Sequence, residues 1–233
     1  IYAGANTGTL TVSKENQSIT FPALQPRLTN AVVAFGATAS SGLPVTEFAV
    51  VSGPGLVSGT NLTFSGTGDV LVEARQSGDG NWNAATAVTN LIKAFSVNPR
   101  NGLAAGGNAV MITNGRIGDG SSITNVTLCG VPAAILEQGT NWVNVQCGPG
   151  TPGIGDLLIQ SDSDIVVSNA YAYNSTGTIF AAAPDTGSFV GGYPVVIAGT
   201  NLCDGTDATN VTLCGVAAAV VSQSPTQLVV VAG

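Results

Sequence analysis

The eight residues TNVTLCGV occur twice in the chain, at residues 124–131 and, 85 positions later, at residues 209–216. When the chain is shifted by this interval, residues 98–148 align with residues 183–233 without a gap, and about 21 of 51 positions are identical. A repeat of this length constrains the fold strongly, because each copy must be one folded unit. The sequence therefore predicts two copies of one domain.

Short apolar runs bounded by turn residues dominate both copies. AVMIT, WVNVQ and QLVVV are rich in β-branched residues, and the chain holds 31 glycines and 11 prolines. No window carries the i, i+3, i+4, i+7 spacing of an amphipathic helix. Several short strands in a unit of about 85 residues are typical of a two-sheet β-sandwich. The predicted fold class is all-β, with tandem β-sandwich domains and almost no helix.

Residues 15–97 form a further unit of similar length and different sequence. In the run DVLVEARQ, Val70, Val72 and Ala74 fall on one face of a predicted strand, so one face can be buried while the other is solvated. Pro99 fixes the backbone at the start of the next unit. The predicted domains are residues 1–14 (the last strand of a preceding domain), 15–97, 98–180 and 181–233, the last of them incomplete.

The two repeated copies resemble IPT/TIG domains, the immunoglobulin-like folds of plexins, Rel-type transcription factors and many surface proteins. The shared pattern is a Pro followed by Gly, a Gly-Gly pair, a Val-x-Ile strand, a Gly/Asn-rich loop and a Val-x-Cys-Gly-Val-x-Ala hairpin. Residues 15–97 are similar to bacterial-type Ig-like repeats, through QSITF, ATASSGLPV, VVSGP and GNWNAA. These resemblances imply architecture rather than an activity.

The two ends of the sequence add a prediction about assembly. Residues 2–10, YAGANTGTL, are similar to residues 171–179, YAYNSTGTI, so we expect residues 1–10 to be the last strand of an upstream domain. The copy at 181–233 lacks counterparts of residues 156–160 and 170–173, which predicts an open sheet edge. Two hypotheses follow. The chain is a window from a longer array, or an extended segment such as GTLTVS of a neighbouring copy completes the edge.

The charge of the chain excludes one class of partner. The formal net charge is -7, with 6 Lys and Arg in 233 residues, which disfavours a phosphate-binding surface and therefore nucleic acid. Charged residues make up 8% of the chain, against about 25% in ordinary soluble domains, so the surface must be built from neutral polar residues. No apolar run approaches the length of a membrane span. We expect a secreted or cell-surface protein.

The repeat also suggests how the 4 cysteines pair. Cys129 and Cys214 are equivalent, whereas Cys147 and Cys203 each occur in one copy alone. Pairing within domains gives Cys129 with Cys147 and Cys203 with Cys214, which is one of three possible connectivities. The alternative is four free thiols buried in a cytosolic protein.

Asn-x-Ser/Thr sequons are candidate glycosylation sites. Asn125 and Asn210 are equivalent in the two copies, where a polar loop meets the Val-Thr-Leu-Cys strand. The alternative is that this Asn caps its loop by bonding to nearby backbone amides. The other sequons begin at Asn16, Asn61 and Asn174.

The sequence contains no complete catalytic or metal-binding motif. Asp185 opens an Asp-Thr-Gly triplet, but an aspartic-protease site needs a second such triplet, and the chain has no histidine to act as a general base. The cysteine spacings do not fit zinc. We predict no cofactor and no enzyme activity. In three acidic loops, at residues 79–83, 162–164 and 203–207, we weigh a calcium site against a plain solvated turn. Trp82 is expected to pack on the end of its sandwich, while Trp142 fits either core packing or a contact site.

The predicted function is structural. We expect an extracellular, non-catalytic segment of an Ig-like array that forms a stalk or filament, with copies of itself or neighbouring Ig-like domains as partners. One alternative is an adhesin or receptor module that recognises a surface protein or a glycan through loops at the sandwich ends. A further alternative is a set of spacer domains in a large secreted enzyme.

Overall fold

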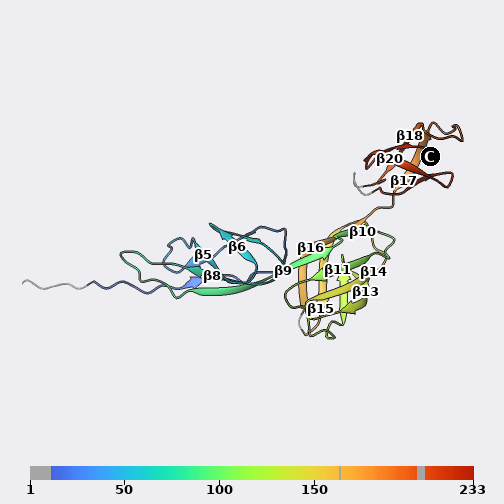
Figure 1. Ribbon diagram of the computed structural model, residues 1–233. Helices are drawn as coiled ribbons and strands as arrows, with labels where there is room; N and C mark the ends of the chain where they lie inside the picture. Colours follow the sequence, from blue (N-terminus) through green and yellow to red (C-terminus); the bar gives the residue numbers. More distant parts are fainter. Residues whose placement is uncertain (1–11, 163, 204–207) are drawn as a thin grey trace, which may run out of the picture.

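Strands make up the regular secondary structure of the described chain. The computed structural model (Figure 1) describes residues 12–162, 164–203 and 208–233, and no helix occurs among them. Short β-branched runs between Gly, Asn and Pro turns form the strands, because such side chains pack well on a pleated, half-buried surface. The all-β prediction is confirmed.

The first unit contains β1 to β8 and the beginning of β9. In β8, Val70, Val72 and Ala74 are fully buried, which confirms the alternation predicted from the sequence. β5, β8 and β9 form one antiparallel sheet, β3, β7 and β6 form another, and β1 pairs with β4. The bounds are β1 Ile19–Thr20, β2 Arg27–Leu28, β3 Val33–Ala34, β4 Thr38–Ala39, β5 Glu47–Ser52, β6 Gly55–Ser58, β7 Asn61–Phe64, β8 Gly68–Arg75 and β9 Val88–Asn98.

The middle unit runs from the end of β9 to β16. Its strands are hydrogen-bonded in the order β9-β11-β14-β13-β12-β15-β16-β10, and they enclose a core that includes Leu128, Tyr171 and Tyr173. The bounds are β10 Asn101–Leu103, β11 Ala109–Thr113, β12 Asn125–Leu128, β13 Val131–Gln138, β14 Trp142–Cys147, β15 Gly153–Gln160 and β16 Asp164–Asn174.

The C-terminal unit is a smaller version of the middle unit. Its strands follow the order β17-β18-β21-β20-β19, around a core that includes Val195, Ile197, Leu228 and Val230. At the 85-residue interval, β18 to β21 correspond to β11 to β14. The bounds are β17 Thr178–Ala183, β18 Pro194–Thr200, β19 Val211–Leu213, β20 Val216–Ser224 and β21 Gln227–Val231.

Two-residue turns explain why both copies repeat Cys-Gly. Cys129 has φ 54 and Gly130 has φ 76, and Cys214 and Gly215 have φ 51 and φ 84. Each pair links two antiparallel strands, because Leu128 is opposite Val131 in the ladder. Positive φ at both turn residues is the geometry of a type I′ hairpin, which matches the twist of the flanking strands. The repeated sequence therefore codes the same hairpin twice.

Candidate functional site: the joint and the open face

One strand joins the first unit to the middle unit without a linker. Within β9, residues 88–94 pair with β8, and Ser96, Val97 and Asn98 pair with β11. Figure 1 shows β9 passing from the sheet of the first unit into the sheet of the middle unit. We call the region around this crossing the joint. A strand that belongs to two sheets is held by hydrogen bonds on both sides of the crossing, which restricts bending there.

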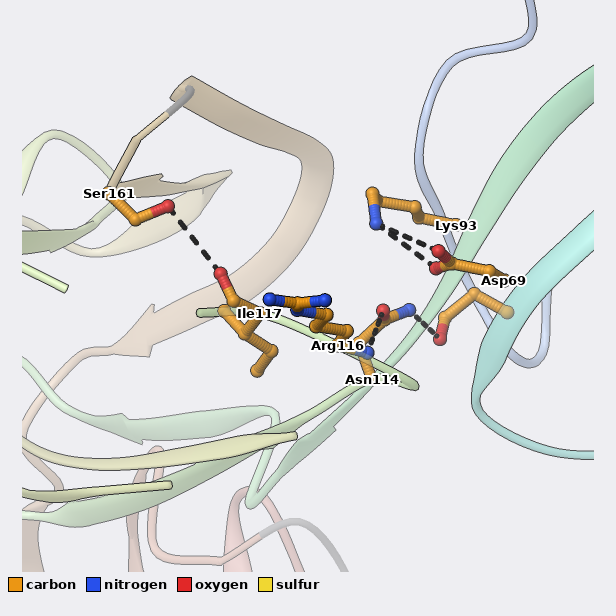
Figure 2. Close-up of polar contacts among 7 residues, drawn as sticks. Asp69, Lys93, Asn114, Arg116, Ile117 and Ser161 are labelled. Atoms are coloured by element: carbon orange, nitrogen blue, oxygen red, sulfur yellow. Dashed lines mark hydrogen bonds and ion pairs between the residues drawn. The ribbon is translucent and has the colours of Figure 1, made fainter. Parts of the chain in front are cut away.

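A buried asparagine locks the joint. Asn114 is 2% exposed, and its Nδ2 donates to the backbone oxygen of Ala94 at 2.8 Å (Figure 2). Its Oδ1 accepts from the backbone N–H of Arg116 at 3.1 Å. Ala94 belongs to the strand of the first unit and Asn114 follows β11 of the middle unit. The amide thus ties the two units together, and it satisfies backbone groups that would be costly to bury unpaired.

An ion pair and two glycines lie beside this amide. Lys93 Nζ is 3.1 Å from both carboxylate oxygens of Asp69, across β9 and β8 (Figure 2). A Cβ added to Gly115 of the middle unit would lie 2.9 Å from the Cα of Gly68 in the first unit. The two backbones therefore approach as closely as glycine permits.

Apolar packing also crosses the joint. β2 of the first unit pairs in parallel with β9, so that Leu28 lies beside Phe95. Leu28 is 7% exposed and belongs to the core cluster of the middle unit, where Phe95 is fully buried. Burial of side chains of this size contributes about 1.5–3 kcal/mol each. The first unit therefore supplies part of the core of the middle unit.

The connection between the middle and C-terminal units is different. β16 ends at Asn174 and β17 begins at Thr178, so residues 175–177 interrupt the strand. Phe180, the counterpart of Phe95, is 67% exposed. The position equivalent to Asn114 is Gly199. The second connection thus lacks both the locking amide and the buried aromatic ring of the joint.

The C-terminal unit presents an uncovered apolar surface. In the middle unit β12 pairs with both β13 and β15, whereas among the described residues β19 pairs with β20 alone. Leu128 is fully buried on β12, and its counterpart Leu213 is half-buried. Val216 beside it is 54% exposed. We call this surface of residues 213–216, with Tyr193 and Val195, the open face.

All 4 cysteines are free thiols in the structure. Cys129 donates to the backbone oxygen of Tyr171 at 3.2 Å, and Cys147 donates to the Tyr171 hydroxyl oxygen at 3.3 Å. Burial raises the pKa of the Cys129 thiol. Both thiols contact the same tyrosine, so the bridge between Cys129 and Cys147 stays a prediction.

The predicted bridge between Cys203 and Cys214 does not fit this placement. Cys203 donates to the backbone oxygen of Ser224 at 3.1 Å, at the end of β20, whereas Cys214 precedes the start of β20 at Val216. A strand of this length spans roughly 26 Å at 3.3 Å per residue, and a disulfide needs Cα atoms within about 7 Å. The repeat assigns both cysteines to one domain, and the structure places them near opposite ends of β20.

The sequons differ in accessibility. Asn210 is exposed, while Asn125 is half-buried and its Nδ2 donates to Gln160 Oε1 at 2.9 Å. Asn125 therefore bonds to the neighbouring strand and does not cap its loop. Glycosylation stays a prediction at all five positions, of which the remaining three are exposed: Asn16, Asn61 and Asn174.

In two acidic loops, an aspartate side chain accepts hydrogen bonds from backbone N–H groups of the same loop. Asp79 Oδ1 accepts from the backbone N–H groups of Asn81 and half-buried Trp82, at 2.8 and 2.9 Å. Asp119 makes a similar turn with the backbone and hydroxyl of Ser121, which lowers the pKa of its carboxyl. No group of three or more Cys, Asp or Glu that could hold a metal occurs among residues 12–162, 164–203 and 208–233. Residues 204–207 lie outside the described chain.

Sequence reasoning missed the residues of the joint. Asn114 lies in no motif, and its role appears when the two units are placed together. Lys93 and Asp69 also lie in no motif, and they face each other across β9 and β8 within the first unit. The two copies differ at this position, where the counterpart of Asn114 is Gly199, but they differ at most other aligned positions too, so no specific signal was present in the sequence. Trp142, the other uncertain position, is half-buried and packs its indole against Gly139. In the described part of the chain no helix has the length and apolarity to cross a membrane.

One protein-family model matches the C-terminal unit. Residues 178–233 match the IPT/TIG domain. Comparison with curated proteins gives no match.

Comparison with solved structures gives several matches, all of low sequence identity. The full extracellular region of plexin A4 is 17% identical with a TM-score of 0.40, over 93% of this chain and 21% of the plexin chain. The D00-D0 domain of intimin is 14% identical with a TM-score of 0.27, over 68% of this chain and 99% of that one. Bacteroides ovatus SGBP-B, in complex with a mixed-linkage heptasaccharide, is 12% identical with a TM-score of 0.26, over 94% and 62%.

The family match and the internal repeat agree. The residues matched by the IPT/TIG family include the second copy of the repeat, and the middle unit carries the first copy at the 85-residue interval. Its strands β11 to β14 are the counterparts of β18 to β21. Residues 178–233 therefore resemble an IPT/TIG domain, and the chain is built from tandem immunoglobulin-like units.

Proposed function

We propose that the chain is a non-catalytic, extracellular structural segment of an array of immunoglobulin-like domains that forms a cell-surface stalk or filament. The joint supports this proposal. β9 runs through two sheets, Asn114 ties them together, and Leu28 of the first unit lies in the core of the middle unit. A joint of this kind fixes the angle between two units. A stalk or filament needs fixed angles between its domains in order to stay extended.

The composition of the surface supports the same role. Charged residues make up 8% of the chain, so neighbouring copies or neighbouring Ig-like domains can pack closely with little repulsion between like charges. Neutral polar surfaces also carry a low desolvation cost when they come into contact, compared with charged ones.

Immunogold electron microscopy of the native material tests the proposal. Antibodies raised against the 233-residue chain should label cell-surface fibres or stalks at regular intervals along their length. Label confined to separate soluble particles that carry an enzyme activity would contradict it, and would favour spacer domains of a secreted enzyme.

A further inference from the structure

The sheet β17-β18-β21-β20 of the C-terminal unit has an apolar outer surface. Core residues such as Val195 and Val230 point inward, so the residues that alternate with them point outward. The ladder places the outward residues in three rows, which are Ala183, Val196, Val229 and Ser222, then Ala181, Ala198, Gln227 and Ser224, then Pro194, Val231 and Ala219. All of them are exposed or half-buried, and none carries a charge. We call this set of residues the flat face.

The middle unit shows that the flat face lies on the outside of the domain. At the positions of Val196 and Val231 it carries Met111, which is 37% exposed, and Gln146, which is also exposed. These positions are open although the middle unit includes β15 and β16. Strands equivalent to β15 and β16 would therefore leave the flat face uncovered. Figure 1 also shows the C-terminal unit set apart from the middle unit at one end of the molecule.

The two copies of the repeat differ at this surface in one direction. The polar side chains of the middle unit and their replacements are Ser96 and Ala181, Asn98 and Ala183, Thr113 and Ala198, Glu137 and Ser222, Asn144 and Val229, and Gln146 and Val231. One position changes in the opposite sense, from Trp142 to Gln227. The solvated side of an antiparallel sheet ordinarily carries polar residues. A contiguous apolar surface in its place marks a site of interaction.

The chemistry of the flat face limits what can cover it. Because it offers no charge, charged groups of a partner would be buried there without an opposite charge. Its side chains are short apart from Gln227, which suits a second flat sheet packed at about 10 Å. The equivalent surface of the middle unit fits less well, since it carries Glu137. The flat face of another copy of the chain is itself flat, apolar and uncharged.

We propose that the flat faces of two copies of the chain pack against each other, sheet on sheet, about a twofold axis. The chain has a formal net charge of -7, and an uncharged surface lets two such copies meet without contact between like charges. A twofold contact uses the same patch on both copies and is therefore closed. The inference rests on the proposed stalk or filament for its role in an assembly, where it supplies the contact that joins two arrays side by side.

The size of the flat face indicates a weak contact between single copies. Strands about 4.8 Å apart and alternate residues about 6.8 Å apart give a patch of roughly 400 Å² per copy, against about 800 Å² per partner in a stable interface. The dissociation constant should accordingly be on the order of 0.1–1 mM. Several such contacts along two arrays would reinforce one another.

Sedimentation equilibrium of the 233-residue chain at concentrations up to about 1 mM measures the contact. We expect the weight-average mass to rise with concentration toward twice the monomer mass. Val229→Asn combined with Val231→Gln gives the flat face the residues that the middle unit carries at Asn144 and Gln146, so the fold accepts them. This double variant should dimerise at least about tenfold more weakly, because two amides would be buried in an apolar contact.

A matched pair of substitutions makes the test specific to the flat face. Val196 and Met111 occupy equivalent positions in the two copies, and both are apolar and accessible. Val196→Asn should weaken the dimer, whereas Met111→Asn should associate as the parent chain does.

Three outcomes would overturn the inference. The chain stays monomeric at about 1 mM, the flat-face variants dimerise as the parent does, or Met111→Asn weakens the dimer as much as Val196→Asn does. Each of these results leaves the stalk or filament role standing, because immunogold labelling tests that role separately. Conversely, a dimer that the flat-face variants abolish would stand even if the labelling showed soluble particles.

Discussion

At the scale of single residues, the Gly-Gly pairs show how the repeat encodes its turns. Gly106 and Gly107 have φ 76 and φ 87, and Gly191 and Gly192 have φ 71 and φ 83. In both copies the second glycine donates its N–H to a backbone oxygen at 2.8 Å. For Gly107 the acceptor is Cys147, at the end of β14, and for Gly192 it is Ala232, directly after β21. Side chains other than glycine are strained at positive φ, so the pair is preserved for backbone reasons.

The two glycines of the middle unit should differ in their tolerance of alanine. A Cβ on Gly106 would lie 2.6 Å from the carbonyl carbon of Gly148, while a Cβ on Gly107 would meet nothing within 4 Å. Gly107→Ala should therefore cost about 1–2 kcal/mol of unfolding free energy through backbone strain alone. Gly106→Ala should cost at least about 3 kcal/mol, because a steric clash adds to the strain.

The measurement is denaturant unfolding in a Trp82→Phe background. The chain has 2 tryptophans, so Trp142 then reports the middle unit alone. Equal losses for Gly106→Ala and Gly107→Ala would show that the clash is relieved by movement of residues 148–149.

Buried tyrosines give the middle unit a dependence on alkaline pH. Burial raises the pKa of Tyr173 from 10.0 to about 12, and it also raises the pKa of Tyr171. A raised pKa favours the neutral form in the folded state, so this contribution to stability is complete below pH 10 and is lost as the pH rises toward 12. The unfolding free energy should fall by up to about 1.4 kcal/mol per pH unit for each tyrosine in that window.

Tyr173→Phe is the matching variant, because it retains the ring and removes the ionisable group. Unfolding at pH 8, 10 and 11 should show a shallower decline for the variant than for the parent chain, with Tyr171 and the Cys129 thiol contributing to the remaining slope. An unchanged slope between pH 10 and 11 would contradict the assignment to Tyr173.

At the scale of elements, the strands were predictable and the contacts between units were not. The alternation of Val70, Val72 and Ala74 predicted the buried face of β8, because the side-chain period of a strand is local. The repeat likewise predicted that both copies share one architecture. Neither pattern reveals which strand ends meet. The repeat could therefore not show that Cys203 lies near Ser224, at the end of β20, while Cys214 precedes the start of that strand. The role of Asn114 depends on a carbonyl in another unit, and no local pattern encodes it.

Loss of the Asn114 amide should weaken the joint. Asn114→Ala leaves the buried oxygen of Ala94 and the N–H of Arg116 without their partner, at a cost of about 1–3 kcal/mol. Thermal unfolding followed by Trp142 fluorescence measures the loss. Asn141→Ala is the control, since Asn141 is exposed nearby and its side chain should contribute less than about 0.5 kcal/mol. Equal effects of the two changes would show that the amide does not lock the joint.

At the scale of the whole molecule, one rigid and one flexible connection should divide the chain into two moving bodies. The first and middle units share β9 and part of a core, whereas residues 175–177 separate β16 from β17. Relative motion is the ordinary behaviour of domains joined by few contacts, and a shared strand removes it.

Backbone ¹⁵N relaxation of the 233-residue chain distinguishes the two connections. Residues of β8 and of β14 should report one rotational correlation time, and residues of β21 a shorter one, because the C-terminal unit moves about residues 175–177. Four residues, Gly-Ser-Gly-Ser, inserted between Phe95 and Ser96 should separate the times of β8 and β14, since the insertion breaks the crossing of β9 between the sheets. Different times for β8 and β14 in the parent chain would mean that the joint bends. In that case the chain would be a flexible string of domains, and the proposed stiff stalk would lose its main structural support.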